Sequence, residues 1–169
     1  MKKNNLILLL LFFIFFSSNN NIFSSPTYSQ FGAGIILGEP WGLTGKYWLD
    51  GKTAIDFALG STNGTKTLQI HGDYLFHDFS LIKVEKVDIP LYFGGGLLFR
   101  LGNESENKFA ANNSDNGDFQ IALRPLVGIG IIFAQKKLEG FLEISPLVLE
   151  IIPNIGLGWS IALGIRYYF

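Results

Sequence analysis

Apolar and polar positions alternate along most of the chain, and the alternation runs longest in its final segment. Between Ile155 and Phe169 the odd positions are bulky and apolar or aromatic, and the even positions before Tyr168 are small or polar. A period of two residues over such a length predicts a β-strand with two different faces. A bulky apolar face opposite a narrow face with Gly, Ser and Arg166 is typical of a membrane β-barrel strand. We therefore interpret residues 155–169 as the closing strand of such a barrel.

Seven earlier segments repeat this alternation between turn-forming residues. Together with the final segment, the predicted strands cover residues 30–38, 42–49, 53–61, 66–77, 89–101, 119–133, 138–149 and 155–169. Residues 38–42, Asp50-Gly51 and Asn63-Gly64 carry the Pro and Gly that tight turns use. A tilted membrane strand needs roughly 9 to 11 residues, and no run reaches the roughly 18 apolar residues of a membrane helix. The sequence therefore predicts an all-β fold, an eight-stranded antiparallel transmembrane up-and-down β-barrel.

Two of the predicted strands contain positions that disturb the alternation. Pro125 falls on the outer face of 119–133, where its missing backbone N–H predicts a β-bulge. In 138–149, Leu147 and Leu149 break the phase. The expected outward side chains of this strand are Leu138, Leu142, Ile144 and Val148, and the inward ones are Glu139, Phe141, Glu143 and Ser145.

The connection 78–88 is longer than periplasmic turns of membrane barrels usually are.

The final strand has the length that a membrane strand requires. Ten steps separate Trp159 from Phe169, and at about 3.3 Å per step and a tilt of about 40° they rise roughly 25 Å. That rise matches the apolar band of an outer-membrane barrel, which aromatic residues border at both edges. We therefore expect Trp159 in one aromatic girdle and Tyr167 with Phe169 in the other.

The first 25 residues predict a cleavable secretory signal peptide. Lys2 and Lys3 precede an unbroken apolar run of eleven residues, 6–16, and small or polar residues follow. An uncleaved N-terminal anchor is the alternative, although the run is shorter than a membrane helix needs. We expect cleavage after a residue between 18 and 29, which leaves a barrel domain at 30–169.

Composition narrows the class of protein. The chain has 169 residues with 20 Gly, 16 Phe and 48% hydrophobic residues but only 16% charged residues, which is apolar for a water-soluble domain. The net charge of −1 gives no basic surface for nucleic acid. Cys is absent, which excludes disulfides, thiolate metal sites, a Cys nucleophile and a lipid attached to an N-terminal Cys.

The predicted inward faces collect the charged side chains. Four are basic and four are acidic: Lys46, Arg100, Arg124 and Arg166, with Asp56, Asp73, Glu139 and Glu143. The two histidines, His71 and His77, share the inward face of 66–77 with Asp73. An eight-stranded barrel is just wide enough for its own side chains, and an unpaired buried charge is very costly. We therefore expect an interior polar network whose ion pairs plug the lumen, with a gated polar path as the alternative.

The histidines raise two chemical alternatives. A His with a Ser and an acid would suit a lipid hydrolase or acyltransferase at the membrane surface, but no Ser lies in a recognisable nucleophile context. His71, Asp73 and His77 point the same way along one strand without converging on a metal ion. The Gly-rich stretch 38–48 has neither the spacing of a phosphate-binding loop nor a helix after it. We predict no catalytic, cofactor or metal site.

Four stretches carry a family resemblance: GIILGEPWGLTGKYWLDGKTAIDFALG (34–60), HGDYLFHDF (71–79), IPLYFGGG (89–96) and GIRYYF (164–169). They resemble a group of small, mostly uncharacterised outer-membrane β-barrel proteins of diderm bacteria, similar in fold to the eight-stranded membrane domain of the OmpA and OmpX type. The resemblance implies recognition by the barrel-assembly machinery through Phe169. It also implies, as in some relatives, surface display with binding to host molecules. It brings no catalytic residues, and loop 102–118 matches nothing in it.

These features favour a monomeric outer-membrane protein with a structural or surface-interaction role and no enzymatic activity. An even number of strands puts both chain ends on one side, the periplasmic side, so that the connections 38–42, 62–65, 102–118 and 149–154 face the exterior. Loop 102–118 is the expected contact with a host or other external ligand. Outer-membrane lipids and the assembly machinery are the other expected partners. The alternatives are a narrow channel for small solutes, an outer-membrane lipid-modifying enzyme and a soluble, lipocalin-like exported barrel.

Overall fold

The regular structure of the chain is β throughout the part that the computed structural model describes, residues 29–62, 67–84, 87–102, 119–133, 137–152 and 155–169. The strands are β1 (Phe31–Gly38), β2 (Trp41–Trp48), β3 (Thr53–Ser61), β4 (Leu68–Asp78), β5 (Lys83–Val84), β6 (Val87–Asp88), β7 (Leu91–Leu101), β8 (Phe119–Phe133), β9 (Leu138–Ile152) and β10 (Gly156–Tyr168). In these residues no helix is long and apolar enough to cross a membrane. The predicted signal peptide, the Asn63-Gly64 turn and nearly all of loop 102–118 lie outside the described residues.

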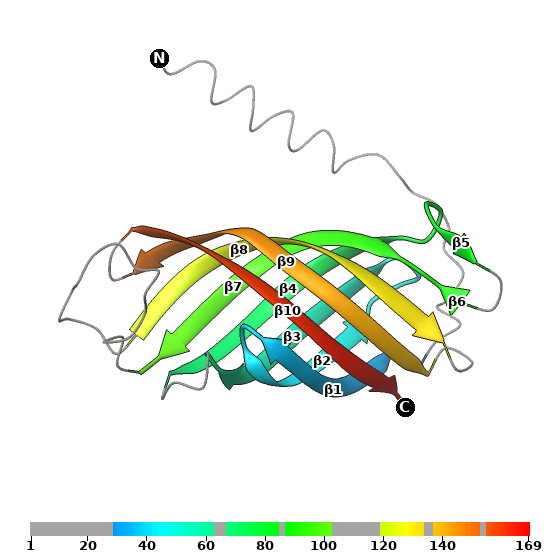
Figure 1. Cartoon of the computed structure of the whole chain (residues 1–169), viewed down its shortest axis with the longest axis horizontal. Coiled ribbons are helices and arrows are strands. Elements are labelled where there is room, and N and C mark those ends of the chain that lie inside the picture. The colour runs from blue at the N-terminus through cyan, green and yellow to red at the C-terminus, as the bar shows by residue number, and fades with distance from the viewer. Residues whose placement is uncertain (1–28, 63–66, 85–86, 103–118, 134–136, 153–154) are drawn as a thin grey trace, which may run out of the picture.

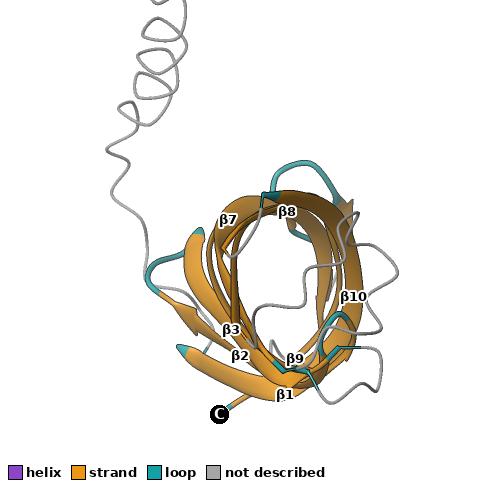
Figure 2. Ribbon diagram, turned by 90° about the vertical axis from the view of Figure 1, so that its left-hand side faces the viewer, coloured by secondary structure: helices purple, strands orange, loops and turns teal. Residues whose placement is uncertain are grey.

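The eight long strands close into an antiparallel up-and-down barrel. Each pairs with the next long strand along the chain, in the order β1, β2, β3, β4, β7, β8, β9 and β10. The ring closes between β10 and β1, which pair from Gly32 opposite Tyr168 to Gly38 opposite Ala162. Figure 1 shows the tilted strands from the side, and Figure 2 shows the closed ring. The predicted eight-stranded antiparallel barrel is therefore confirmed.

The two ends of the barrel carry different parts of the chain. β1 begins and β10 finishes at the same end, which we call the terminal end (Figure 1). Phe31 stacks on Phe169 there, with 6.3 Å between the ring centroids. The opposite end carries the turn between β1 and β2, where Gly38 has a φ of 122° that other residues rarely adopt.

Most strand boundaries lie within two residues of those predicted, but the connection 78–88 is more than a loop. β5 and β6 form a short ribbon inside it, with Val84 opposite Val87, and Asp88 pairs with Ile132 of β8. Pro90, which has no N–H to donate, separates β6 from β7, while its carbonyl oxygen accepts from Gly130 N at 2.9 Å. The ribbon therefore accounts for the length of this connection.

The alternation along each strand sets two opposite faces of the barrel wall. On β4, Ile70 and Tyr74 are 42% and 43% exposed, whereas His71 is 1% exposed. All eight long strands carry large apolar side chains on the outside. Apolar clusters inside are small, such as the one at the terminal end formed by Trp48, Ala54, Ile132 and Tyr168. The buried interior of this barrel is therefore rich in polar and charged groups.

The β-bulge predicted at Pro125 lies instead on the neighbouring strand. Pro125 is exposed and keeps its place opposite Gly95 in the ladder between β7 and β8. Between Ser145 and Val148, β9 has one more residue than the adjoining parts of β8 and β10. Ser145 Oγ donates a hydrogen bond of 2.6 Å to the Pro125 carbonyl oxygen at the edge of this bulge. Because Pro125 offers no N–H to β9, the ladder is interrupted on the β9 side.

The extra residue reverses the sidedness of β9. Pro146 and Leu147 are both exposed, and Val148 is only 1% exposed, so the expectation that Val148 faces outward is wrong. β9 continues to Ile152, beyond its predicted end at residue 149. Glu150 then points inward, where its carboxylate meets a lumen cation.

The turn between β2 and β3 depends on Asp50. Its Oδ1 accepts hydrogen bonds of 2.7 Å from the backbone N–H groups of Lys52 and Thr53, and its Oδ2 accepts one of 2.6 Å from Thr53 Oγ1. Partial burial favours the protonated acid, but the bonds from Thr53 and Lys52 outweigh it and hold the pKa of Asp50 below its ordinary value of 3.8. The fold therefore stabilises the carboxylate form.

We expect Asp50→Ala to lower the free energy of unfolding by about 1–2 kcal/mol at neutral pH, because two turn N–H groups lose their acceptor. Asp50→Asn keeps an acceptor oxygen and should lose less. Because the folded-state pKa is depressed, this contribution is complete above 3.8 and disappears as the pH falls through the folded-state pKa. Urea unfolding at neutral and acid pH measures the difference. An Asp50→Ala loss that does not shrink in acid would contradict this account.

Candidate functional site in the barrel interior

All ten predicted interior residues lie on the inner face of the barrel wall, and none is more than 8% exposed. They come from every long strand except β1. Contacts join nine of them into a central network: Lys46, Asp56, His71, Asp73, His77, Arg124, Glu139, Glu143 and Arg166. Arg100 belongs to a separate group at the opposite end.

Arg166 of β10 is the centre of the network. Its Nη2 lies 2.6 Å from Asp56 Oδ2 and 3.7 Å from Glu143 Oε1, and its Nη1 lies 3.5 Å from Glu139 Oε2. Its Nε and Nη2 also donate to Thr44 Oγ1 at 3.1 and 2.8 Å. One guanidinium therefore joins side chains of β2, β3 and β9 to the closing strand.

Two glycines allow close packing beside Arg166. Gly34 lies opposite Arg166, and a Cβ on Gly34 would overlap the Arg166 backbone and the Ile165 carbonyl oxygen. The Phe141 ring covers Gly164, and Arg166 Cζ lies 3.7 Å from the centroid of that ring. A cation held over an aromatic face is attracted by the ring electrons. Gly34 thus allows β1 to approach the backbone of β10, and Gly164 allows the Phe141 ring to lie where it contacts Arg166.

Lys46 extends the network toward the terminal end. Its Nζ lies 2.6 Å from Glu139 Oε1 and 3.3 Å from His77 Nε2. Tyr168 donates its hydroxyl to the other oxygen of Glu139 at 2.6 Å. Lys46 Nζ also lies 4.9 Å from the centroid of the Tyr92 ring. Glu139 therefore has short contacts to β2, which is not a neighbour of β9, and to the neighbouring β10.

Arg124 is held more loosely. Its Nη1 lies 3.5 Å from Asp73 Oδ2, its Nη2 lies 3.8 Å from Glu143 Oε2, and His71 Nε2 lies 3.6 Å from the same Asp73 oxygen. Among the described residues, both Asp73 oxygens, both His71 ring nitrogens and two Arg124 nitrogens have no hydrogen-bond partner. Gly96 lies between Asp73 and Arg124 in the sheet, and a Cβ there would meet Asp73. The wall therefore leaves these charges close but without direct hydrogen bonds.

Arg100 pairs with two acids that the sequence interpretation assigned to connections. Its Nη1 lies 3.2 Å from Glu150 Oε1, its Nη2 lies 3.9 Å from Glu39 Oε2, and its Nε donates to Gln69 Oε1 at 3.0 Å. Glu150 reaches Arg100 because the β9 bulge turns it inward. The expected balance of four bases and four acids is therefore wrong. The central network sets three cations, Lys46, Arg124 and Arg166, against four carboxylates.

Neutral hydrogen-bonding residues also belong to the network and were missed from the sequence. Thr44 and Tyr168 bond to Arg166 and Glu139, and Tyr92 donates its hydroxyl to Glu143 Oε1 at 3.0 Å. All three occupy inward positions of strands that alternate regularly. Strand parity places all three on the inner face, but neutral side chains give no charge signal that would mark them as members of the network.

Trp159, Tyr167 and Phe169 lie on the outer face toward the two ends of β10. They are 57%, 44% and 69% exposed, respectively. The Tyr167 and Phe169 rings meet edge to face, with 5.5 Å between their centroids. The position fits the two predicted girdles, whose role at membrane interfaces stays a prediction.

Neither histidine pairs with a serine in the described part of the chain. His77 contacts Lys46, and its Nδ1 lies 3.2 Å from the Lys52 carbonyl oxygen. His71 contacts Asp73. Within the same residues, no group of three His, Asp or Glu side chains is placed to hold a metal ion. His71 therefore contacts a neighbour on its own strand, and His77 contacts Lys46 of β2 and the turn before β3.

Comparisons with protein-family models, with curated proteins and with solved structures found no match to this chain. A functional proposal therefore rests on the closed barrel, its apolar outer face and its buried polar network.

We expect Arg166→Met to lower the free energy of unfolding by about 3–5 kcal/mol, because three buried carboxylates lose their shared cation. The same change at Arg100, whose two acids are partly exposed near the opposite rim, should cost less, about 1 kcal/mol. Urea unfolding of the refolded barrel, followed by tryptophan fluorescence, measures both values. Equal losses in the two variants would contradict a central role for Arg166.

Proposed function

We propose that the chain is an exported outer-membrane β-barrel protein of a diderm bacterium, of the OmpA and OmpX membrane-domain type, with a structural or surface-interaction role. In this proposal the protein is monomeric, ion pairs close its lumen, and it carries out no catalysis. Its partners are the outer-membrane lipids, the barrel-assembly machinery and an external or host ligand that contacts loop 102–118.

The observation that carries the proposal is that the barrel wall has its apolar side chains outside and its charged side chains inside, the reverse of a water-soluble barrel. On the adjoining strands β1 and β10, Ile35, Leu163 and Ile165 are 54%, 53% and 50% exposed. The same belt runs over all eight long strands, while the ion pairs lie inside. In water, so large an apolar surface favours association and aggregation. Acyl chains offer an apolar surrounding that removes this cost. A soluble lipocalin-like barrel would instead have polar side chains outside and apolar side chains inside.

The closed lumen favours a structural or surface role over transport. Contacts of 2.6 Å join Lys46 to Glu139 and Arg166 to Asp56, between strands on different sides of the ring. All four residues are 1% exposed or less. Side chains paired so closely fill the width of an eight-stranded barrel.

A narrow channel is the second candidate, and the loose part of the network favours it. Asp73, His71 and Arg124 keep buried polar atoms without hydrogen-bond partners among the described residues. Such atoms attract water, and a file of waters would offer a path for very small solutes.

The membrane assignment predicts losses of stability of different size for two matched substitutions. Leu163→Arg puts a charge in the middle of β10, and Ile155→Arg puts the same charge just before β10, at a position that is 81% exposed. In lipid, Leu163→Arg should lose about 2–4 kcal/mol of stability and Ile155→Arg about 0–1 kcal/mol. Urea unfolding in phosphatidylcholine vesicles, with unheated and heated gel mobility as the probe of closure, measures the difference.

A barrel that refolds without detergent or lipid and tolerates both charges equally would overturn the membrane assignment. Fractionation of expressing cells gives the compartment independently, and the proposal requires the heat-modifiable band in the outer-membrane fraction.

Planar-bilayer recording separates the two candidate functions. The closed-lumen proposal predicts no reproducible conductance steps from the wild type, because short ion pairs cross the lumen. Asp56→Ala with Glu139→Ala removes two of the carboxylates that pair with Arg166 and Lys46, so it should raise the frequency of openings. Regular conductance steps from the wild type would favour the channel instead.

A further inference from the structure

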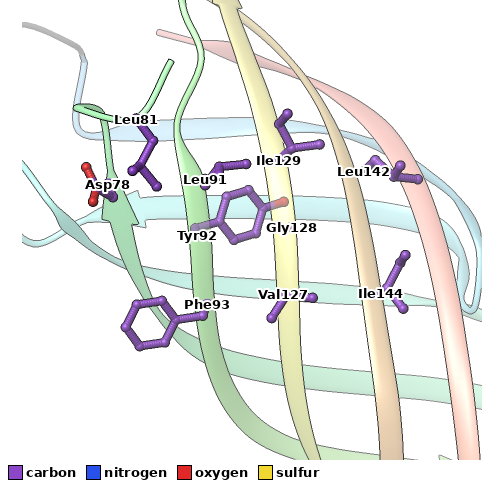
Figure 3. Close-up of a pocket in the computed structure, with 10 residues that line it drawn as sticks. All are labelled: Asp78, Leu81, Leu91, Tyr92, Phe93, Val127, Gly128, Ile129, Leu142 and Ile144. Atoms are coloured by element: carbon purple, nitrogen blue, oxygen red, sulfur yellow. The ribbon is translucent and has the colours of Figure 1, made fainter. Parts of the chain in front are cut away.

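A groove of about 500 Å³ lies on the outside of the barrel near the terminal end (Figure 3). Outward side chains of β7, β8 and β9 form its floor and sides, and Leu81 of the connection after β4 lies at one side. The residues that matter here are Leu81, Phe93, Val127, Ile129, Leu142 and Ile144. It is therefore a hollow in the apolar outer belt, separate from the lumen.

The course of the chain explains why the belt is hollow at this point. β4 ends at Asp78, opposite Leu91, and the chain then leaves the wall before β6 rejoins it beside β8. Gly128 faces the lumen side of the wall, where the Tyr92 ring occupies the space that a side chain would fill. The hollow on the outer face therefore follows from the course of the chain after β4.

The charged residue Asp78 lines the groove, and a basic residue lies on the neighbouring turn. The Asp78 Oδ1 accepts hydrogen bonds of 2.7 and 2.6 Å from Ser80 N and Ser80 Oγ. The Lys52 ammonium interacts electrostatically with the Asp78 carboxylate. Lys52 lies on the neighbouring turn, where its carbonyl oxygen accepts from His77 N at 2.7 Å. An acid therefore lines the apolar groove, and a base lies on the turn beside it.

We propose that this groove holds one acyl chain of a zwitterionic glycerophospholipid, with the lipid ammonium at Asp78 and its phosphate toward Lys52. The inference rests on the proposed membrane location. Moving an acyl chain from surrounding lipid into an apolar groove changes little hydrophobic free energy, because both surroundings are apolar. Preference for one lipid must therefore come from the charges at the rim and from the fit of the chain in the trough.

The test uses the full chain purified from membranes in a mild detergent, with native mass spectrometry to count retained lipids. We expect one dipalmitoyl phosphatidylethanolamine to remain bound, and at least tenfold less anionic phosphatidylglycerol. Val127→Trp fills the groove and should reduce retention of phosphatidylethanolamine at least tenfold. Leu123→Trp is the matched control, because Leu123 faces outward on the same strand and does not line the groove. Asp78→Asn should remove the preference between the two lipids.

Equal retention by the wild type and Val127→Trp would overturn the groove as the site, and equal retention of both lipids by the wild type would overturn the zwitterionic assignment. A dimer that only Val127→Trp dissociates would assign the groove to a second copy and likewise contradict the proposal. Ile129→Phe serves as a second filling variant if Val127→Trp lacks the heat-modifiable band. A barrel that inserts in vesicles but retains no lipid refutes this inference alone, whereas failure to insert refutes the membrane proposal.

Discussion

The guanidinium of Arg166 meets the constraint that an eight-stranded lumen imposes. Such a lumen holds little besides the side chains of its own wall, so every inward charge needs a counter-charge among those side chains. Arg166 supplies one to Asp56, Glu139 and Glu143 from the strand that closes the barrel. Pairing of β10 with β1 brings the guanidinium to these carboxylates, and the ion pairs in turn hold β10 to β3 and β9. Closure of the sheet and neutralisation of its interior therefore support each other.

The network has short contacts around Glu139 and longer ones around Asp73. The short contacts favour the closed lumen, and the longer ones favour the channel. Glu139 has contacts of 2.6 Å to Lys46 and Tyr168, while Asp73 has none shorter than 3.5 Å to Arg124 and His71. Tight pairing makes the wall rigid and closed. Polar groups without direct partners leave a place for solvent. A single lumen thus combines tightly paired charges with polar groups that retain unused hydrogen-bonding capacity.

The period of two was sufficient to predict the barrel, its strand number and the inward position of the charged residues, because a strand pattern is local. Which charged residues form ion pairs with one another could not be predicted from the sequence. Lys46 and Glu139 meet from β2 and β9, which are not neighbours, so their contact depends on how the strands tilt and stagger around the ring. Leu147 and Leu149 break the alternation of their strand, but the pattern does not show that one extra residue continues the strand with its faces exchanged, so it predicts Glu150 in a connection.

The bulge in β9 divides the strand into two parts in which opposite sequence parity faces the lumen. On its terminal side the strand presents Glu139 and Glu143 to the central network, and beyond Pro146 and Leu147 it presents Val148 and Glu150 instead. The rotational mismatch between the two parts is absorbed within a few residues. Changes of sequence or length at the opposite rim are therefore uncoupled from the orientation of the central carboxylates. A barrel built in this way has a rim that is free to diversify above an interior that stays fixed.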